Sequence, residues 1–182
     1  MKRQKKVSKG IIKETKKTKN SIAIEELHKE IDLIQACITR MADNSFRLKE
    51  LYVSLVVIAL TVMMSQEYIL SIIGLFLFFV TIVFWGLDAF FLKMETLYRW
   101  KYEWVIKKRE KGIREHLYDL NPHNKDMWLN MKNKKECFMK FVFSKTLVPL
   151  YGIVAVVAII MLIIAVINKG ENIYVYWIQF TT

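Results

Sequence analysis

Three long windows of the chain carry no charged residue and predict helices that cross a membrane. They are residues 51–65, 68–87 and 146–167. A helix needs about 20 apolar residues to cross the hydrocarbon core of a bilayer. The second and third windows are long enough, and the first is long enough if it starts near Phe46, because Arg47 and Lys49 can extend to the interface. We therefore predict an all-α membrane protein with three transmembrane helices.

The charges outside these windows predict the orientation. Residues 1–50 hold 13 Lys plus Arg against 7 Asp plus Glu, and residues 93–145 hold 14 against 7. The positive-inside rule places such segments in the cytoplasm. We therefore expect a membrane protein whose N-terminus is cytoplasmic and whose C-terminus lies outside, with long helices that extend into a cytoplasmic helical region.

Composition changes along the chain and predicts six segments. Residues 1–20 hold nine Lys plus Arg against one Glu, which is typical of a disordered arm. Asn121-Pro122 predicts a break between two cytoplasmic helices, the second over about 123–143. The predicted segments are a basic disordered arm (1–20), a cytoplasmic amphipathic helix (21–50), a transmembrane hairpin (51–92), a cytoplasmic helical hairpin (93–145), a third transmembrane helix (146–168) and an outer interfacial tail (169–182).

The cytoplasmic helix before the first window has an apolar stripe with alternating spacings of three and four. Such a stripe fits either a coiled coil with a second copy or a helix packed on its own chain, and the sequence leaves both open. The stripe consists of Ile24, Leu27, Ile31, Ile34, Ile38 and Met41.

Asp88 is the one acid at the end of an otherwise uncharged window. An ionisable group inside a membrane helix is costly, so it is expected to be paired. A hairpin that turns at Gln66 and Glu67 brings Asp88 to the depth of Ser45 and Arg47. We therefore predict that Asp88 pairs with Arg47 or accepts a hydrogen bond from Asn44.

Ser54, Thr61 and Thr81 are polar residues within the first two windows. Such residues either bind neighbouring helices through hydrogen bonds or line an aqueous path. Three helices are too few to enclose a path, so a pore requires a ring of identical subunits. Under the pore hypothesis, these three side chains face the lumen.

Arg109 and His116 match the R-x4–6-H spacing of HEPN-type ribonucleases. In such a site the Arg stabilises phosphate charge and the His moves protons. Chance alone supplies about 0.3 such matches in a chain of this composition, so the pair is a weak motif and a solvated helix face is the alternative. The scattered His and Cys residues indicate no metal site, and no motif indicates a cofactor.

Two blocks flank the predicted membrane hairpin and carry a family resemblance. They are RMADNSF at 40–46 and FWGLDAFFLKMETLYR at 84–99. The chain resembles a family of small, defence-associated bacterial membrane proteins with an FWxLDA motif, whose best-known branch is the accessory membrane protein of type VI-B CRISPR systems. The resemblance implies a subunit that assembles into a membrane pore and strengthens defence driven by an RNA-guided, RNA-cutting effector.

The leading hypothesis is therefore a ring-like homo-oligomer that permeabilises or depolarises the membrane. Its expected partners are the lipid bilayer, further copies of itself and, functionally, the RNA-targeting effector, with RNA or anionic lipid at the basic cytoplasmic face. A membrane-tethered HEPN-like ribonuclease and a non-enzymatic scaffold for a cytoplasmic partner are the alternatives. The hypothesis of enzymatic activity therefore rests on the Arg109 and His116 motif alone.

Overall fold

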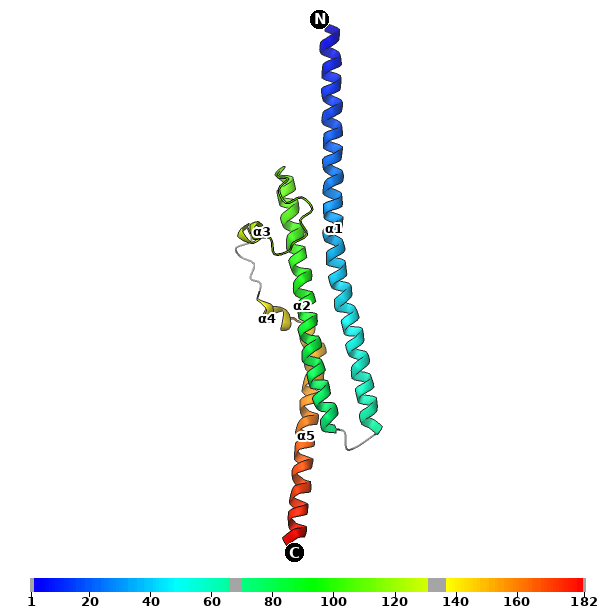
Figure 1. The fold of residues 1–182 in the computed structure, drawn as a ribbon, viewed down its shortest axis with the longest axis vertical. Helices are drawn as coiled ribbons and strands as arrows, with labels where there is room; N and C mark the ends of the chain where they lie inside the picture. Colours follow the sequence, from blue (N-terminus) through cyan, green and yellow to red (C-terminus); the bar gives the residue numbers. More distant parts are fainter. Residues whose placement is uncertain (1, 66–69, 131–136, 182) are drawn as a thin grey trace. The chain divides into compact units, whose positions relative to one another are not determined.

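The protein is helical throughout the part of the chain that the structure describes. The computed structural model describes the backbone of residues 2–65, 70–130 and 137–181, and the side chains of residues 24–62, 72–129 and 137–167. No strand occurs within these ranges, so the prediction of an all-α chain is confirmed for them. The helices are α1 (Lys2–Ser65), α2 (Leu70–Glu110), α3 (Lys125–Asn130), α4 (Phe138–Val142) and α5 (Leu147–Thr181) (Figure 1).

The chain divides into two compact units. Unit 1 comprises Met1–Arg40 and Glu95–Lys134, and unit 2 comprises Met41–Met94 and Lys135–Thr182. Each unit therefore combines segments that are distant in the sequence. The predicted hairpin turn at Gln66 and Glu67 lies outside the described residues.

Unit 2 packs parts of α1, α2 and α5 around two apolar clusters. The first cluster includes Tyr52, Ala89 and Tyr151, one residue from each of the three helices. Close helix approach occurs at Gly74, where an added Cβ would lie 3.3 Å from the Leu162 side chain. Small residues allow membrane helices to approach closely, and here they do so within one chain.

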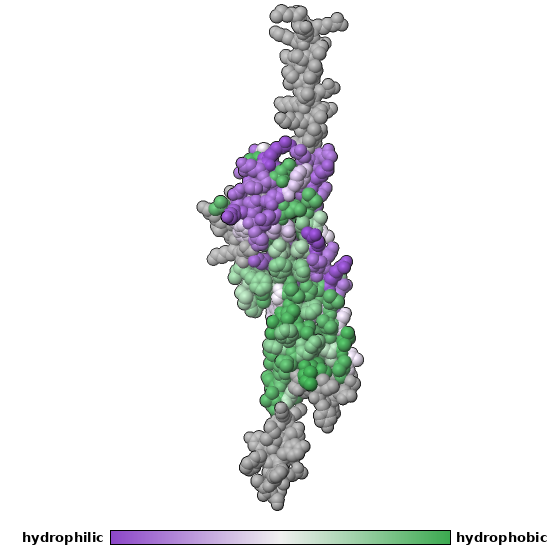
Figure 2. All heavy atoms as spheres, in the orientation of Figure 1, coloured by the Kyte–Doolittle hydropathy of each residue, from purple (hydrophilic) through white to green (hydrophobic). Residues whose placement is uncertain are grey.

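Two helices, α2 and α5, are long and apolar enough to cross a membrane. Only 22% of the most apolar stretch of α2 and 17% of that of α5 are buried inside the chain. A core helix of a soluble protein would be mostly buried, so this exposure is compatible with a lipid environment. Figure 2 shows the resulting apolar surface over these helices in green. The predicted first span is the apolar end of α1, which does not reach the same length and hydropathy within its described residues.

Unit 1 has its own core, formed where α1 packs against α2 and α3. Ile34, Trp104, Val105 and Met127 are buried there. Ile34 belongs to the apolar stripe of the cytoplasmic helix, and Ile38 packs against the same core. Of the two alternatives for this stripe, the structure therefore supports packing within the chain.

The secondary structure differs from the prediction at three places. Residues 2–20 belong to α1 instead of forming a disordered arm, because Lys, Gln and Glu are good helix formers and extend a helix already fixed by packing. Helix α2 ends at Glu110, where Gly112 adopts a φ of 73° and its N–H bonds the Arg109 carbonyl. The helix predicted over 123–143 appears as the short helices α3 and α4. Residues 131–136 of that prediction lie outside the described part of the chain.

Candidate functional site

A polar cluster around Asp88 joins α1, α2 and α5 in unit 2. Asp88 has no exposed surface. Its carboxylate accepts a hydrogen bond from Ser45, pairs with Lys49 Nζ at 2.8 Å, and accepts a hydrogen bond from the Tyr151 hydroxyl at 3.0 Å. The acid is therefore paired and hydrogen-bonded, as a buried charge requires. We call these four residues the Asp88 cluster.

Each helix supplies the cluster for a simple geometric reason. Ser45 and Lys49 are four residues apart on α1, so they lie on one face, and Lys49 Nζ also donates to Ser45 Oγ at 2.6 Å. The Lys49 side chain is 31% exposed, so it extends from the surface of the unit to the buried acid. Tyr151 follows the start of α5 by one turn, which directs its hydroxyl towards Asp88 on α2.

The predicted partners of Asp88 were wrong. Arg47 is exposed, and neither Arg47 nor Asn44 is among the residues that bind the carboxylate. The predicted depth was correct, but the neighbouring positions Ser45 and Lys49 face α2. A helix turns 100° per residue, so an error of two positions moves a side chain to the opposite side. The contribution of Tyr151 was missed because it lies in an uncharged window, where the sequence indicates a membrane helix and no polar contact.

A second polar contact lies deeper in unit 2. The hydroxyls of Tyr52 and Thr81 are 3.0 Å apart, and Thr81 Oγ1 donates to the Leu77 carbonyl at 2.6 Å. Thr81 is completely buried inside the chain, so the prediction that it faces a lumen was wrong. The ring of Tyr52 also packs against that of Tyr151 at 4.7 Å, which connects this contact to the Asp88 cluster.

Ser54 and Thr61, the other two predicted lumen residues, are exposed on α1. Ser54 Oγ donates to the Glu50 carbonyl at 2.9 Å, and Thr61 Oγ1 donates to the Val57 carbonyl at 2.8 Å. Each donor is thereby satisfied by its own helix, and lone pairs of each oxygen point outwards. Both side chains are available to a sister subunit or to water.

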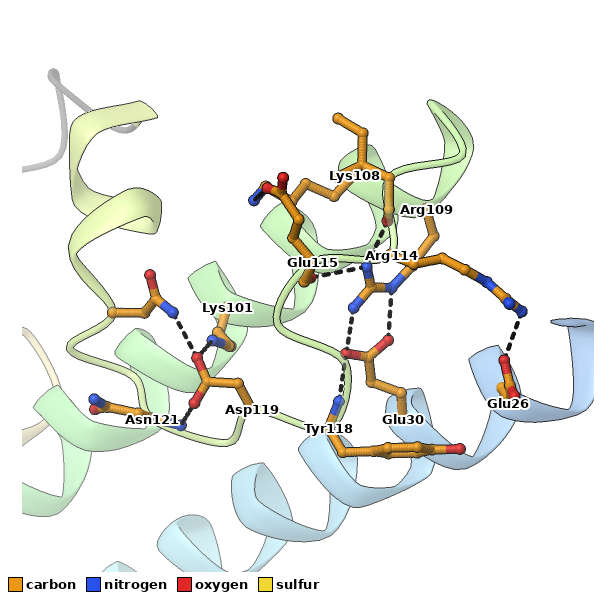
Figure 3. A network of polar contacts seen from close by, with 12 residues as sticks. Glu26, Glu30, Lys101, Lys108, Arg109, Arg114, Glu115, Tyr118, Asp119 and Asn121 are labelled. Carbon is orange, nitrogen blue, oxygen red and sulfur yellow. Dashed lines mark hydrogen bonds and ion pairs between the residues drawn. The ribbon is translucent and has the colours of Figure 1, made fainter.

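Unit 1 contains a separate ion-pair network around Glu30 and Arg109 (Figure 3). Arg109 Nε and Nη2 bind the two Glu30 oxygens at 2.8 Å and 2.7 Å, a bidentate arrangement. Arg109 Nη1 donates to the carbonyls of Ile113 and Glu115. Glu30 also accepts a bond from the Tyr118 backbone N–H at 3.1 Å. The network fixes the loop that follows α2 against α1.

Arg109 and His116, the predicted HEPN-like pair, make separate contacts in the structure. The Arg109 guanidinium directs donors from all three of its nitrogens to protein acceptors, and its side chain is buried. His116 instead binds Asp126 through Nε2 at 2.7 Å and lies with its ring 6.2 Å from that of Trp104. Arg109 therefore serves loop structure, and the two residues have different partners. The importance of Glu30 was missed, because an acid in a charged helix looks like a solvated residue.

Lys101 and Asp119 form another ion pair in unit 1, between a buried lysine and a partly exposed acid (Figure 3). Lys101 Nζ lies 2.9 Å from Asp119 Oδ2, and Lys101 has no exposed surface. Burial alone would raise the pKa of Asp119, but hydrogen bonds from Lys101, the Asn121 backbone N–H and Asn124 outweigh it and hold that pKa below its usual value. Asp119 is therefore ionised in the folded protein and organises the loop between α2 and α3.

Trp104 is surrounded by cations in unit 1. Nζ of Lys101 lies 4.8 Å and Nζ of Lys108 lies 4.5 Å from the centre of its ring. These cation–π contacts stabilise the positions of both lysines. The indole Nε1 is the one buried side-chain nitrogen or oxygen without a hydrogen-bond partner among the described side chains.

Neither unit contains a recognisable metal site among its described side chains. No group of three or more His, Cys, Asp or Glu residues gathers there. Cys37 is buried and Cys137 is exposed, and both are free thiols. The polar groups of both clusters are paired within the protein, so the clusters hold helices and a loop in place.

Comparison with known proteins identifies no family for the chain. No family model matches the chain, and no curated protein or solved structure matches it significantly. The resemblance carried by residues 40–46 and 84–99 therefore stays a prediction. The chain is described by what its geometry supports: two helices able to cross a membrane and a buried, paired acid between them.

Proposed function

We propose that the chain is a subunit of a homo-oligomeric pore that permeabilises or depolarises the bacterial inner membrane. The observation that carries the proposal is a polar stripe on the outward face of α1. Arg47, Ser54 and Thr61 are spaced by seven residues and are all exposed, and Glu50 lies on the same face. The donors of Ser54 and Thr61 are satisfied on their own helix, but this side of α1 is more polar than the exposed surfaces of the apolar stretches of α2 and α5. We therefore place it against a sister subunit or water.

The proposed topology has three membrane helices. The apolar end of α1 packs with α2 and α5 in unit 2. Its exposed side carries Leu51, Val57 and Ile58 beside the polar stripe, so a sister subunit that packs on this side would cover apolar as well as polar side chains. The positively charged segments place the N-terminus in the cytoplasm and the C-terminus outside. Three spans in one subunit leave no room for a lumen within it, because Thr81 and Asp88 are sealed inside.

A ring of subunits resolves this problem. If the polar stripe of α1 faces a common axis, then Ser54 and Thr61 line an aqueous path while the apolar surfaces of α2 and α5 face lipid. Closed rings are the ordinary outcome when identical head-to-tail interfaces repeat around an axis. The proposed link to an RNA-guided effector rests on the FWGLDA motif at 84–89.

Two measurements on the purified protein test the pore. Images of detergent-solubilised particles should show closed rings with a central hole, and liposomes containing the protein should release a small dye. Ser54→Leu and Thr61→Leu should keep the rings and reduce dye release severalfold. Thr146→Leu is the matched control, since Thr146 is an exposed hydroxyl outside the stripe. Particles without a hole, or unchanged release from both stripe variants, would contradict the proposal.

The geometry supports the ribonuclease alternative less well. The nitrogens of Arg109 are engaged by Glu30 and two carbonyls, so none is directed to a phosphate. A double variant, Arg109→Ala with His116→Ala, should abolish RNA cleavage if the protein is a ribonuclease, whereas Ser54→Leu should not. A protein that neither releases dye nor cleaves RNA fits the scaffold alternative.

A further inference from the structure

Helix α4 is fixed on the membrane helices of unit 2 by its inner side. The Trp85 indole N–H donates to the Val142 carbonyl at 2.8 Å. The ring of Phe143 meets that of Trp85 edge to face at 6.3 Å, and Phe141 is buried in the cluster formed with Leu147. A helix of five residues has little stability of its own, so these contacts determine its position.

Other apolar side chains of this segment are exposed, and Phe143, which follows α4, is exposed beyond its edge contact with Trp85. Phe138 is 40%, Met139 is 55% and Phe143 is 63% exposed. Lys140 and Lys145 are exposed beside them. Large apolar side chains interleaved with lysines are typical of segments that lie in the interface of a membrane.

The attachment points of α4 place it where the apolar windows end. Trp85 lies three residues before Asp88 on α2, and Leu147 is the first residue of α5. In the proposed topology both positions are at the cytoplasmic ends of their spans. Phe90 on α2 and Val148 on α5, near the same ends of the two helices, are exposed apolar residues as well. In that topology the apolar side chains of α4 are at the depth of the upper acyl chains, and Lys140 and the nearby Lys145 are at the depth of the head groups.

We infer that α4 with Phe143 and Lys145 is a lipid-binding element that inserts into the cytoplasmic interface and selects anionic phospholipid head groups. This inference rests on the membrane placement in the proposed function. Lipid fits better than a second copy of the chain, because lysines are depleted in the cores of protein interfaces, whereas they attract anionic lipid at a membrane surface. Each lysine near an anionic leaflet is expected to strengthen binding about fivefold.

Cys137 gives a direct test, because it is exposed and immediately precedes Phe138, whereas Cys37 is buried. An environment-sensitive fluorophore on Cys137 reports contact with lipid when the full chain is reconstituted in vesicles. One vesicle set contains brominated phosphatidylglycerol with ordinary phosphatidylcholine, and the other has the bromine on phosphatidylcholine. We expect quenching in both sets and stronger quenching when the phosphatidylglycerol carries the bromine.

Variants separate the charge contribution from the apolar one. Lys140→Gln with Lys145→Gln should remove the preference for phosphatidylglycerol, while Lys125→Gln, an exposed lysine of unit 1, should retain it. Phe138→Ser with Phe143→Ser should reduce quenching by both brominated lipids. Protein with Cys137→Ser gives the background from Cys37.

Three outcomes would overturn the inference. The first is a fluorophore quenched by iodide from water and not by brominated lipid. The second is energy transfer between labels that rises with the protein-to-lipid ratio while lipid quenching falls, which would identify a second copy as the occupant. The third is an unchanged lipid preference in the double lysine variant. The two proposals can fail separately. If rings form and release dye but the label on Cys137 is exposed to water, only the lipid-binding inference is wrong. If brominated lipid quenches the label but no ring forms, only the pore proposal is wrong.

Discussion

Replacing Asp88 by Leu should destabilise unit 2 strongly, because three donors then lose their common acceptor. The hydrogen bonds from Ser45 and Tyr151 are worth about 0.6 kcal/mol each between membrane helices. The charged bond from Lys49 is worth about 1.5 kcal/mol, the lower end of its range, because Lys49 is partly exposed and screened. Their sum, about 3 kcal/mol, corresponds to a change of about 100-fold in the unfolding equilibrium.

The assay is reversible unfolding in mixed micelles of dodecyl maltoside and increasing sodium dodecyl sulfate. Tryptophan fluorescence reports the cluster directly, since Trp85 stacks on Tyr151 with ring centres 6.1 Å apart. Asp43→Leu, which removes an exposed acid of unit 2, is the control and should change little. Adding Lys49→Met to Asp88→Leu should recover part of the stability, because no uncompensated charge is then left. A loss below about 1 kcal/mol, or one equal to the control, would refute the reasoning.

Three further predictions concern packing, acid sensitivity and the loop after α2. Gly74→Val should lower the free energy of unfolding by about 1 to 3 kcal/mol in the same titration, because the new side chain clashes with α5. Gly86→Val is the control, because a Cβ at Gly86 meets nothing within 4 Å. Equal effects of the two variants would contradict the close approach at Gly74. Because the pKa of Asp119 is lowered by folding, its contribution to stability is present above its usual value of 3.8 and is lost as pH falls below it. The protection factors of the amides in the 111–124 loop, which are corrected for the intrinsic exchange rate at each pH, should fall there. Asp119→Asn should show lower protection at neutral pH and a smaller further loss in acid; a variant as acid-sensitive as the parent would contradict this. Arg109→Lys should cost about 2 kcal/mol and expose the loop to proteases, whereas Arg99→Lys on the exposed surface of α2 should not; equal protection of both would argue against a structural role.

The sequence predicted helices and apolar windows well because both depend on the periodicity of many residues. Helix α5 begins at Leu147, one residue from the predicted start of the third window. The helical state of residues 2–20 was missed, because composition measures the cost of ordering a polar segment and ignores the helix that it extends.

The site was harder to predict because a single residue's direction depends on the packing of the whole bundle. The need of Asp88 for a cationic partner could be inferred from its place at the end of a span. The choice of Lys49 instead of Arg47 depends on which face of α1 meets α2, and the sequence contains basic residues on both faces. The fate of Arg109 was equally hidden, because Glu30 is 79 residues away along the chain.

The order in which the Asp88 cluster is synthesised has a consequence for membrane insertion. Ser45 and Lys49 leave the ribosome before Asp88, whereas Tyr151 follows it by 63 residues. In the proposed topology, the charge of the acid is neutralised as soon as α1 and α2 meet, and the two helices can enter lipid together with Asp88 already paired. Helix α5 then joins a finished hairpin and adds the last hydrogen bond, which makes its arrival the step that locks the bundle.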